Sequence, residues 1–159
     1  MILGIHHIAM HTPNFDAMAR FYRDAFGFRP PSDEFGWRDS PLMDRGIDVK
    51  GSAARGLLLK AGNTYIELFG YENPPPRDAG AARPNDHGYT HFGIEVTDIA
   101  AEMERLGALG MTFPEPEPID IGDVKFIYGK DPDGNIIELL EMARGHVHAM
   151  ERLDVTLPG

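Results

Sequence analysis

The chain has 159 residues, of which 42% are hydrophobic, as expected for one ordinary globular domain or two small modules sharing a core. Its formal net charge of -10 argues against binding to nucleic acid or to anionic membrane surfaces, because both partners require a basic face. The absence of cysteine excludes disulfides, thiolate metal sites and a cysteine nucleophile. No apolar run approaches the roughly 20 residues that cross a bilayer, and no basic leader precedes an apolar core, so we expect a cytoplasmic protein without a signal peptide.

The chain begins with a pattern that predicts a strand followed by a helix. Residues 2–10 are apolar over a length typical of a strand. Thr12-Pro13-Asn14 is a helix-start signal, because it offers a capping side chain and a proline that the first turn tolerates. Apolar residues then recur at helical spacing over residues 15–26, and Gly27 is expected to end the helix.

A loop and a hairpin are expected to follow. Residues 29–56 are rich in Pro, Gly, Asp and Ser, which predicts irregular structure with one short strand around Phe35–Trp37. Residues 56–60 and 64–69 then predict the two strands of a hairpin, since the turn sequence Ala61-Gly62-Asn63 separates them.

The same order of elements returns in the second half of the chain. Residues 90–96 predict a strand, Thr97-Asp98 caps a helix over residues 99–109, and residues 124–129 predict a second strand. The turn sequence Asp131-Pro132-Asp133-Gly134 leads into the last strand. The predicted organisation is a first module over residues 1–72, a Pro/Gly-rich linker over 73–87, a second module over 88–142 and a C-terminal tail over 143–159, which carries no clear pattern.

Each half carries one glutamate inside an apolar strand. Glu67 lies in the sequence GNTYIELF and Glu138 lies in GNIIELL, so the two contexts match. An unpaired carboxylate in a dry interior costs several kcal/mol. A solvated face, a cationic partner or a metal ion must therefore compensate each of these charges.

Each half also places a histidine on its first strand, His7 in the first and His91 in the second. If the two sheets face each other, both imidazoles and both carboxylates converge on one centre. Such a set of nitrogen and oxygen donors without sulfur suits Fe(II), Mn(II), Ni(II), Co(II) or Zn(II). A cation at this centre would compensate both glutamates.

Five segments together carry a resemblance to a known family: HHIAMHT, FYRDAFGF, IELF, HFGIEVTDI and DPDGNIIEL. They closely resemble the vicinal-oxygen-chelate superfamily, which includes glyoxalase I, methylmalonyl-CoA epimerase, extradiol dioxygenases and the fosfomycin- and bleomycin-resistance proteins. The resemblance covers residues 1–142. It implies an α+β fold in which two βαβββ modules form a cupped, barrel-like sheet with a metal ion inside the cup.

The resemblance implies four ligands to one divalent metal ion, namely His7, Glu67, His91 and Glu138. Glyoxalase I and the epimerases resemble this chain at Glu67, whereas extradiol dioxygenases generally have no ligand there. The resemblance therefore favours a lyase or isomerase that moves a proton through an enediolate, with Glu67 or Glu138 as the base. An Fe(II) ring-cleaving dioxygenase and a drug-binding or resistance protein are the alternatives.

A small molecule with vicinal oxygens is the expected substrate, and a homodimer is the expected assembly, because many relatives build or complete the cup between chains. No clear set of basic residues for glutathione or coenzyme A is present, so the substrate stays open. Further residues are expected to line its pocket, either because they share a strand face with the four ligands or because they lie in the first loop: His11, Trp37, Tyr65, Phe69 and Glu95.

Overall fold

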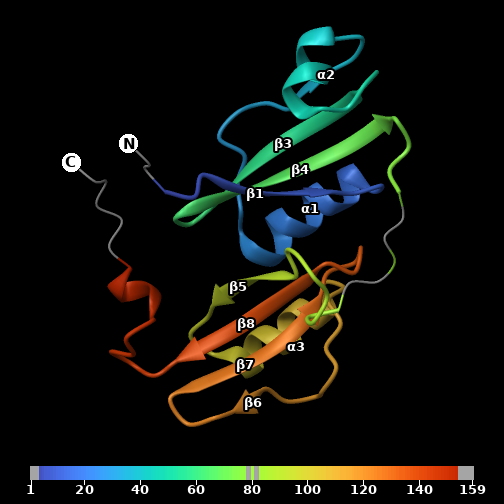
Figure 1. The fold of residues 1–159 in the computed structure, drawn as a ribbon. Coiled ribbons are helices and arrows are strands. Elements are labelled where there is room, and N and C mark those ends of the chain that lie inside the picture. Colours follow the sequence, from blue (N-terminus) through green and yellow to red (C-terminus); the bar gives the residue numbers. More distant parts are fainter. Residues whose placement is uncertain (1–3, 78–79, 81–82, 154–159) are drawn as a thin grey trace, which may run out of the picture. The chain divides into compact units, whose positions relative to one another are not determined.

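A computed structural model describes residues 4–77, 80 and 83–153 of the chain. The chain divides into two compact units, one ending at residue 78 and the other beginning at residue 79 (Figure 1). Each unit contains one four-stranded sheet with parallel and antiparallel pairs. The predicted α+β class with two βαβββ modules is confirmed. No helix among the described residues has the length and apolar character needed to span a membrane.

The first unit builds its sheet in the order β1-β4-β3-β2, with β1 parallel to β4 and the other pairs antiparallel. One helix, α1, follows β1, and a second helix, α2, is inserted before β3. The elements are β1 (His7–His11), α1 (Phe15–Phe26), β2 (Phe35–Trp37), α2 (Pro41–Ile47), β3 (Ala53–Ala61) and β4 (Thr64–Asn73).

The second unit repeats this topology, with its strands in the order β5-β8-β7-β6 and β5 parallel to β8. A short 3-10 helix follows the last strand. The elements are β5 (His91–Glu95), α3 (Ile99–Ala108), β6 (Ile119–Asp120), β7 (Val124–Lys130), β8 (Ile136–Met142) and the 3-10 helix (Met150–Arg152).

The helices α1 and α3 each cover the apolar side of their own sheet. On α1 the residues Met18 and Tyr22, one helical turn apart, are almost fully buried, as are Ile66 and Leu68 on β4. In the second unit Leu106 of α3 and Leu139 of β8 are both fully buried. Because side chains on a strand alternate, this packing leaves the opposite face of each sheet free to carry polar side chains.

Local signals explain where α1 ends and where α3 begins. The capping side chain predicted for the start of α1 was wrong, because the Asn14 side chain makes no capping hydrogen bond there. The predicted end of α1 at Gly27 is confirmed, since Gly27 has a φ of 68° and its N–H donates to the carbonyl oxygen of Arg23. The predicted cap of α3 is also confirmed, because the Asp98 side chain accepts a hydrogen bond from the N–H of Ala101.

Two other local predictions were wrong. The first strand begins at His7 and not at residue 2, although residues 1–3 lie outside the described part. Residues 29–56, predicted to be irregular apart from β2, contain α2, which buries none of its residues and therefore shows no apolar period. Capping stabilises this helix instead, because the Ser40 side chain accepts from the N–H of Met43. No structure was predicted for the tail, which contains the 3-10 helix; its residues 154–159 lie outside the described part.

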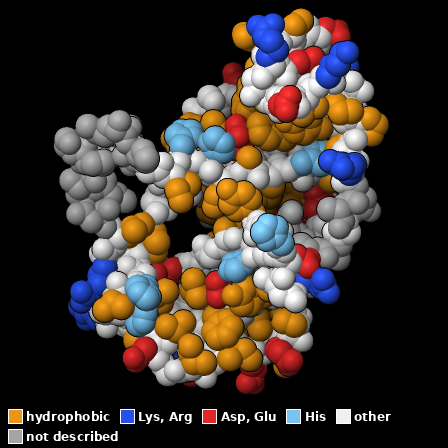
Figure 2. Space-filling view, viewed as in Figure 1, with side chains coloured by type: hydrophobic (Ala, Val, Ile, Leu, Met, Phe, Trp, Pro, Cys, Tyr) orange, Lys and Arg blue, Asp and Glu red, His pale blue; other side chains and the backbone are white. Residues whose placement is uncertain are grey.

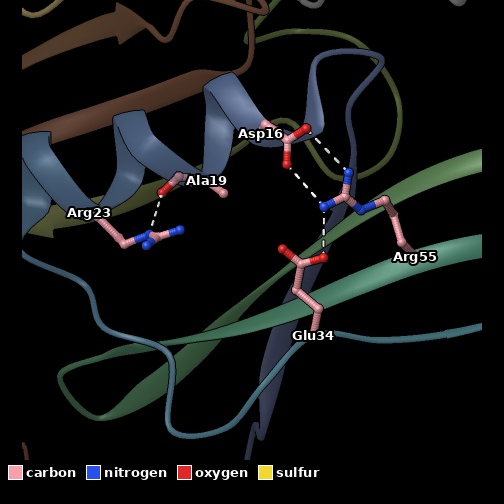
Figure 3. Close-up of polar contacts among 5 residues, drawn as sticks. All are labelled: Asp16, Ala19, Arg23, Glu34 and Arg55. Carbon is pink, nitrogen blue, oxygen red and sulfur yellow. Dashed lines mark hydrogen bonds and ion pairs between the residues drawn. The ribbon is translucent and has the colours of Figure 1, made fainter.

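An arginine joins three segments of the first unit. The Arg55 guanidinium on β3 donates to Asp16 in the first turn of α1 and to Glu34 just before β2, over distances of 2.7–3.2 Å (Figure 3). It also lies 4.2 Å from the centre of the Phe15 ring. These hydrogen bonds to Glu34 and Asp16 raise the pKa of Arg55. The start of α1 is thereby held against the sheet that carries Glu67.

A matching ion pair in the second unit makes its stability depend on pH. The Glu141 carboxylate on β8 accepts from the N–H of Ile99 and from the Lys125 ammonium, and these bonds lower the pKa of Glu141 below its ordinary value of 4.5. A lowered folded-state pKa stabilises the fold above the unfolded value, and the stabilisation is lost as pH falls through the folded value. In urea unfolding below about pH 4.5, we expect Glu141→Gln to lose stability less steeply than the parent protein. An unchanged slope would contradict this expectation.

Candidate metal centre

The first unit brings His7 and Glu67 together on the side of its sheet away from α1. The His7 Nε2 lies 3.2 Å from the Glu67 Oε2, and the two side chains are 41% and 13% exposed. The parallel pairing of β1 with β4 places Ala9 beside Glu67, so His7 is two residues away on the same face. The His7 Nδ1 contacts the His6 Nδ1 at 2.9 Å, which leaves Nε2 directed towards the carboxylate.

The second unit repeats this arrangement with His91 and Glu138. The His91 Nε2 lies 3.4 Å from the Glu138 Oε2, and the side chains are 27% and 16% exposed. Gly93 on β5 pairs with Glu138 as Ala9 pairs with Glu67, so the register of the two units is the same. The His91 Nδ1 contacts the Thr90 hydroxyl at 2.8 Å. In both units a neighbouring polar group therefore orients the ring and leaves Nε2 facing the carboxylate.

Each of these pairs has the donor chemistry of half a metal site. Ligand atoms about 2.0–2.2 Å from one ion lie about 3 Å apart from each other, close to both observed nitrogen–oxygen separations. Neither carboxylate pairs with a Lys or Arg side chain in the described part of the chain. Over residues 4–77, 80 and 83–153, no group of three or more ligating side chains is gathered. Each unit by itself therefore gathers two side chains that could bind a metal ion.

Two tyrosines that the sequence analysis missed lie close to the glutamates. Burial and the negative charge of Glu67 raise the pKa of Tyr71, which shares a face of β4 with that glutamate. Tyr128 on β7 lies directly across the ladder from Glu138, and its ring centre is 4.9 Å from that of His91. Burial, the charge of Glu138 and a hydrogen bond to it raise the pKa of Tyr128. Strand alternation would have found Tyr71, whereas finding Tyr128 requires the hairpin register.

Three of the five predicted pocket residues gather on the same face of the first sheet as Glu67. The Trp37 and Phe69 rings meet edge to face with centres 5.9 Å apart. The His11 Nδ1 lies 3.1 Å from the carbonyl oxygen of Phe69, and the His11 ring centre lies 5.9 Å from that of Tyr71. Hydrophobic, acidic and histidine side chains are accordingly seen together on the surface of each unit (Figure 2).

The other two predicted pocket residues have local partners. The Tyr65 ring packs against His6 with centres 5.0 Å apart, next to the proposed ligand His7. The Glu95 carboxylate accepts a hydrogen bond of 2.7 Å from the N–H of Met150. Glu95 thus holds the 3-10 helix of the tail, a contact that the sequence pattern did not reveal.

Comparison with known proteins shows the family of the chain. The model of the Glyoxalase/Bleomycin resistance protein/Dioxygenase superfamily matches residues 4–139, and the chain therefore belongs to this superfamily.

Individual relatives resemble the chain over most of its length. It is 31% identical over 146 residues to an ethylmalonyl-CoA/methylmalonyl-CoA epimerase of Cereibacter sphaeroides, covering 87% of this chain and 98% of the relative. It is 29% identical over 138 residues to the uncharacterized protein YaeR of Escherichia coli, covering 86% and 95%. A glyoxalase family protein of Bacillus cereus shares the fold with a TM-score of 0.80 at 18% identity, covering 90% of this chain and 96% of that one.

Proposed function

We propose that this protein is a divalent-metal-dependent lyase or isomerase that moves a proton on a small substrate with vicinal oxygens. The observation that carries the proposal is the pair of His–Glu half-sites in identical strand register. The proposed ligands of the single metal ion are His7, Glu67, His91 and Glu138. The protein is further proposed to act as a homodimer, in which one chain or two chains supply the four ligands.

The residues of the half-sites suit proton transfer beside a carbonyl group. A bound divalent metal ion polarises substrate oxygens and so lowers the pKa of the neighbouring C–H. Glu67 or Glu138 takes up that proton as a general base and returns it. Their side chains are only 13% and 16% exposed, which limits competition from bulk water. Tyr71 and Tyr128 stay protonated because their pKa values are raised, so both can donate hydrogen bonds to oxygen atoms nearby.

Two further observations support a lyase or isomerase over a ring-cleaving dioxygenase. Glu67 lies 3.2 Å from His7, in the same arrangement as Glu138 and His91 in the second unit. Each unit therefore offers a carboxylate as well as a histidine as a candidate ligand. A named epimerase is 31% identical over nearly its full length. An epimerase moves a proton at a carbon beside an acyl group, which is the chemistry proposed for this site.

Metal analysis followed by an activity panel tests the proposal. We expect a divalent metal to activate turnover of a methylglyoxal–thiol adduct or of a 2-substituted acyl thioester. Oxygen uptake with a catechol that requires Fe(II) and survives Glu67→Gln would overturn the assignment in favour of a dioxygenase. Absence of any divalent-metal binding would overturn it altogether.

Two amide variants then identify the base. Glutamine retains a carbonyl oxygen that can bind a metal ion but cannot accept the proton. We expect Glu67→Gln and Glu138→Gln both to retain metal, while turnover falls by about 10²–10⁴-fold in whichever variant lacks the base. Glu104→Gln on the exposed side of α3 is the matched control and should keep full turnover. Equal, small losses in both variants would exclude either glutamate as the base.

A further inference from the structure

A cavity of about 300 Å³ lies within the second unit, where residues 112–114 run beside β7. This volume is at the lower end of the range for small-molecule sites. The wall is mostly apolar and contains one cationic side chain. The residues that bear on its chemistry are Thr112, Phe113, Pro114, Tyr128, Lys130 and Ile136.

The wall of this cavity is held in place by backbone contacts. Thr112 and Lys130 exchange two hydrogen bonds, with N···O distances of 2.9 and 2.8 Å. Gly129 lies between Tyr128 and Lys130 on β7, and a Cβ atom there would lie 2.6 Å from the Phe113 ring. Glycine therefore allows Phe113 to pack directly on the strand backbone. The cavity is a built feature of the unit, because both contacts define the position of residues 112–114.

The cavity adjoins the proposed ligands of the second unit. Tyr128, one of its lining residues, contacts the His91 ring and lies across the ladder from Glu138. Ile136, another lining residue, pairs with His91 in the β5–β8 ladder. A molecule in this cavity would therefore lie next to the side chains that are proposed to hold the metal ion and to move the proton.

Lys130 gives the cavity a positive charge, and no carboxylate in the described part of the chain is its counter-ion. It forms no ion pair with any carboxylate in the described part of the chain, in contrast to Lys125 on the same strand, which pairs with Glu141. Because side chains alternate along a strand, Lys130 and Tyr128 lie on the same face of β7. An anionic ligand suits a lysine ammonium beside an apolar wall. When the ligand binds, each charge loses contact with water, and the opposite charge compensates this loss.

We propose that this cavity binds a small organic acid, with its carboxylate at Lys130 and its apolar arm against Phe113 and Ile136. The inference rests on the proposed function, because it names the substrate class of that same site. It adds that the substrate carries a free carboxylate in addition to the group that reacts.

Binding of simple carboxylates tests the inference with the full-length, metal-loaded protein. The probes are 3-methylbutanoate and phenylacetate, each compared with its uncharged amide by isothermal titration calorimetry. We expect each carboxylate to bind at least about tenfold more tightly than its amide, because a hydrogen bond to a charged group contributes more than a neutral one. Chemical shifts of the Thr112 and Lys130 amides in ¹⁵N-labelled protein locate the bound probe.

Two matched variants make the test specific. Lys130→Gln should remove the preference for carboxylate over amide. Lys60→Gln is the matched control and should leave this preference unchanged, because Lys60 does not line the cavity. Lys60 holds the equivalent place in the first unit, where it forms a β-bridge with Arg29 as Lys130 does with Thr112. Phe113→Ala should shift the preference towards probes with longer apolar arms. Circular dichroism of each variant confirms that it is folded.

The outcomes separate this inference from the proposed function. Repeating the titration after chelation should still show carboxylate binding, because the cavity is lined by residues of the second unit alone. Carboxylate binding in a protein that takes up no metal would support the cavity and overturn the proposed metal chemistry. Metal-dependent turnover with equal binding of carboxylate and amide, or with probe shifts confined to other residues, would overturn the inference alone.

Discussion

Replacement of His91 with alanine is expected to abolish stoichiometric metal binding. The imidazole Nε2 faces Glu138 at 3.4 Å and is the only nitrogen donor that the described part of the second unit places beside this carboxylate. Removing one of the four proposed ligands would leave three donors and an open position. Because changes to groups that only orient a ligand already cost about 10–100-fold in metal affinity, we expect a loss of at least about a hundredfold. Titration monitored by calorimetry and metal analysis of the dialysed protein measure the change.

The matched control is His87→Ala, because His87 is exposed and forms no hydrogen bond or ion pair within the described part of the chain. This control should keep the metal content of the parent protein. His7→Ala should reproduce the loss seen with His91→Ala, since the two histidines hold equivalent positions in the two units. Full metal content in His91→Ala would exclude the proposed ligand set.

Replacement of Asp131 with alanine is expected to lower the free energy of unfolding by about 2–4 kcal/mol. Asp131 is 4% exposed. Its carboxylate accepts hydrogen bonds of 2.8–3.0 Å from the N–H groups of Asp133 and Asn135 and from the Asn135 side chain. Without the carboxylate these donors lose their partner in the turn that leads into β8. Urea unfolding followed by circular dichroism measures the change.

The control for this prediction is Asp24→Ala, which removes an exposed carboxylate from α1 and should change stability by less than about 0.5 kcal/mol. Asp131→Asn should fall between the two variants, because one oxygen acceptor remains. A stability of Asp131→Ala equal to that of Asp24→Ala would show that these hydrogen bonds do not stabilise the turn. The position of Glu138 depends on this turn, so metal affinity should fall together with stability.

Much of the fold could be predicted from the sequence because the relevant signals are local. The apolar spacing of α1 and α3, the C-cap of α1, the N-cap of α3 and the paired Gly-Asn turns require only neighbouring residues to be interpreted. The single glutamate in each apolar strand also pointed to a need for compensation. α2 was missed because it packs no apolar face against the sheet.

Other features depend on pairing between distant strands. The sequence showed that His7 and Glu67 lie on strands, but not that β1 runs parallel to β4 in a register that places them 3.2 Å apart. Tyr128 was missed for the same reason, because it meets Glu138 only through the β7–β8 ladder. The predicted pocket residue Glu95 also acquires its Met150 contact from the folded tail.

The sequence by itself determined the two βαβββ modules, the matching His and Glu residues and the superfamily to which the chain belongs. Only the tertiary structure decided that each histidine meets its glutamate within one unit, that two tyrosines lie beside these carboxylates and that a lysine lines a cavity next to the second pair. The physical reason is that helix periodicity, caps and turns act over a few residues. Strand register and cavity walls arise from contacts between segments far apart in the chain.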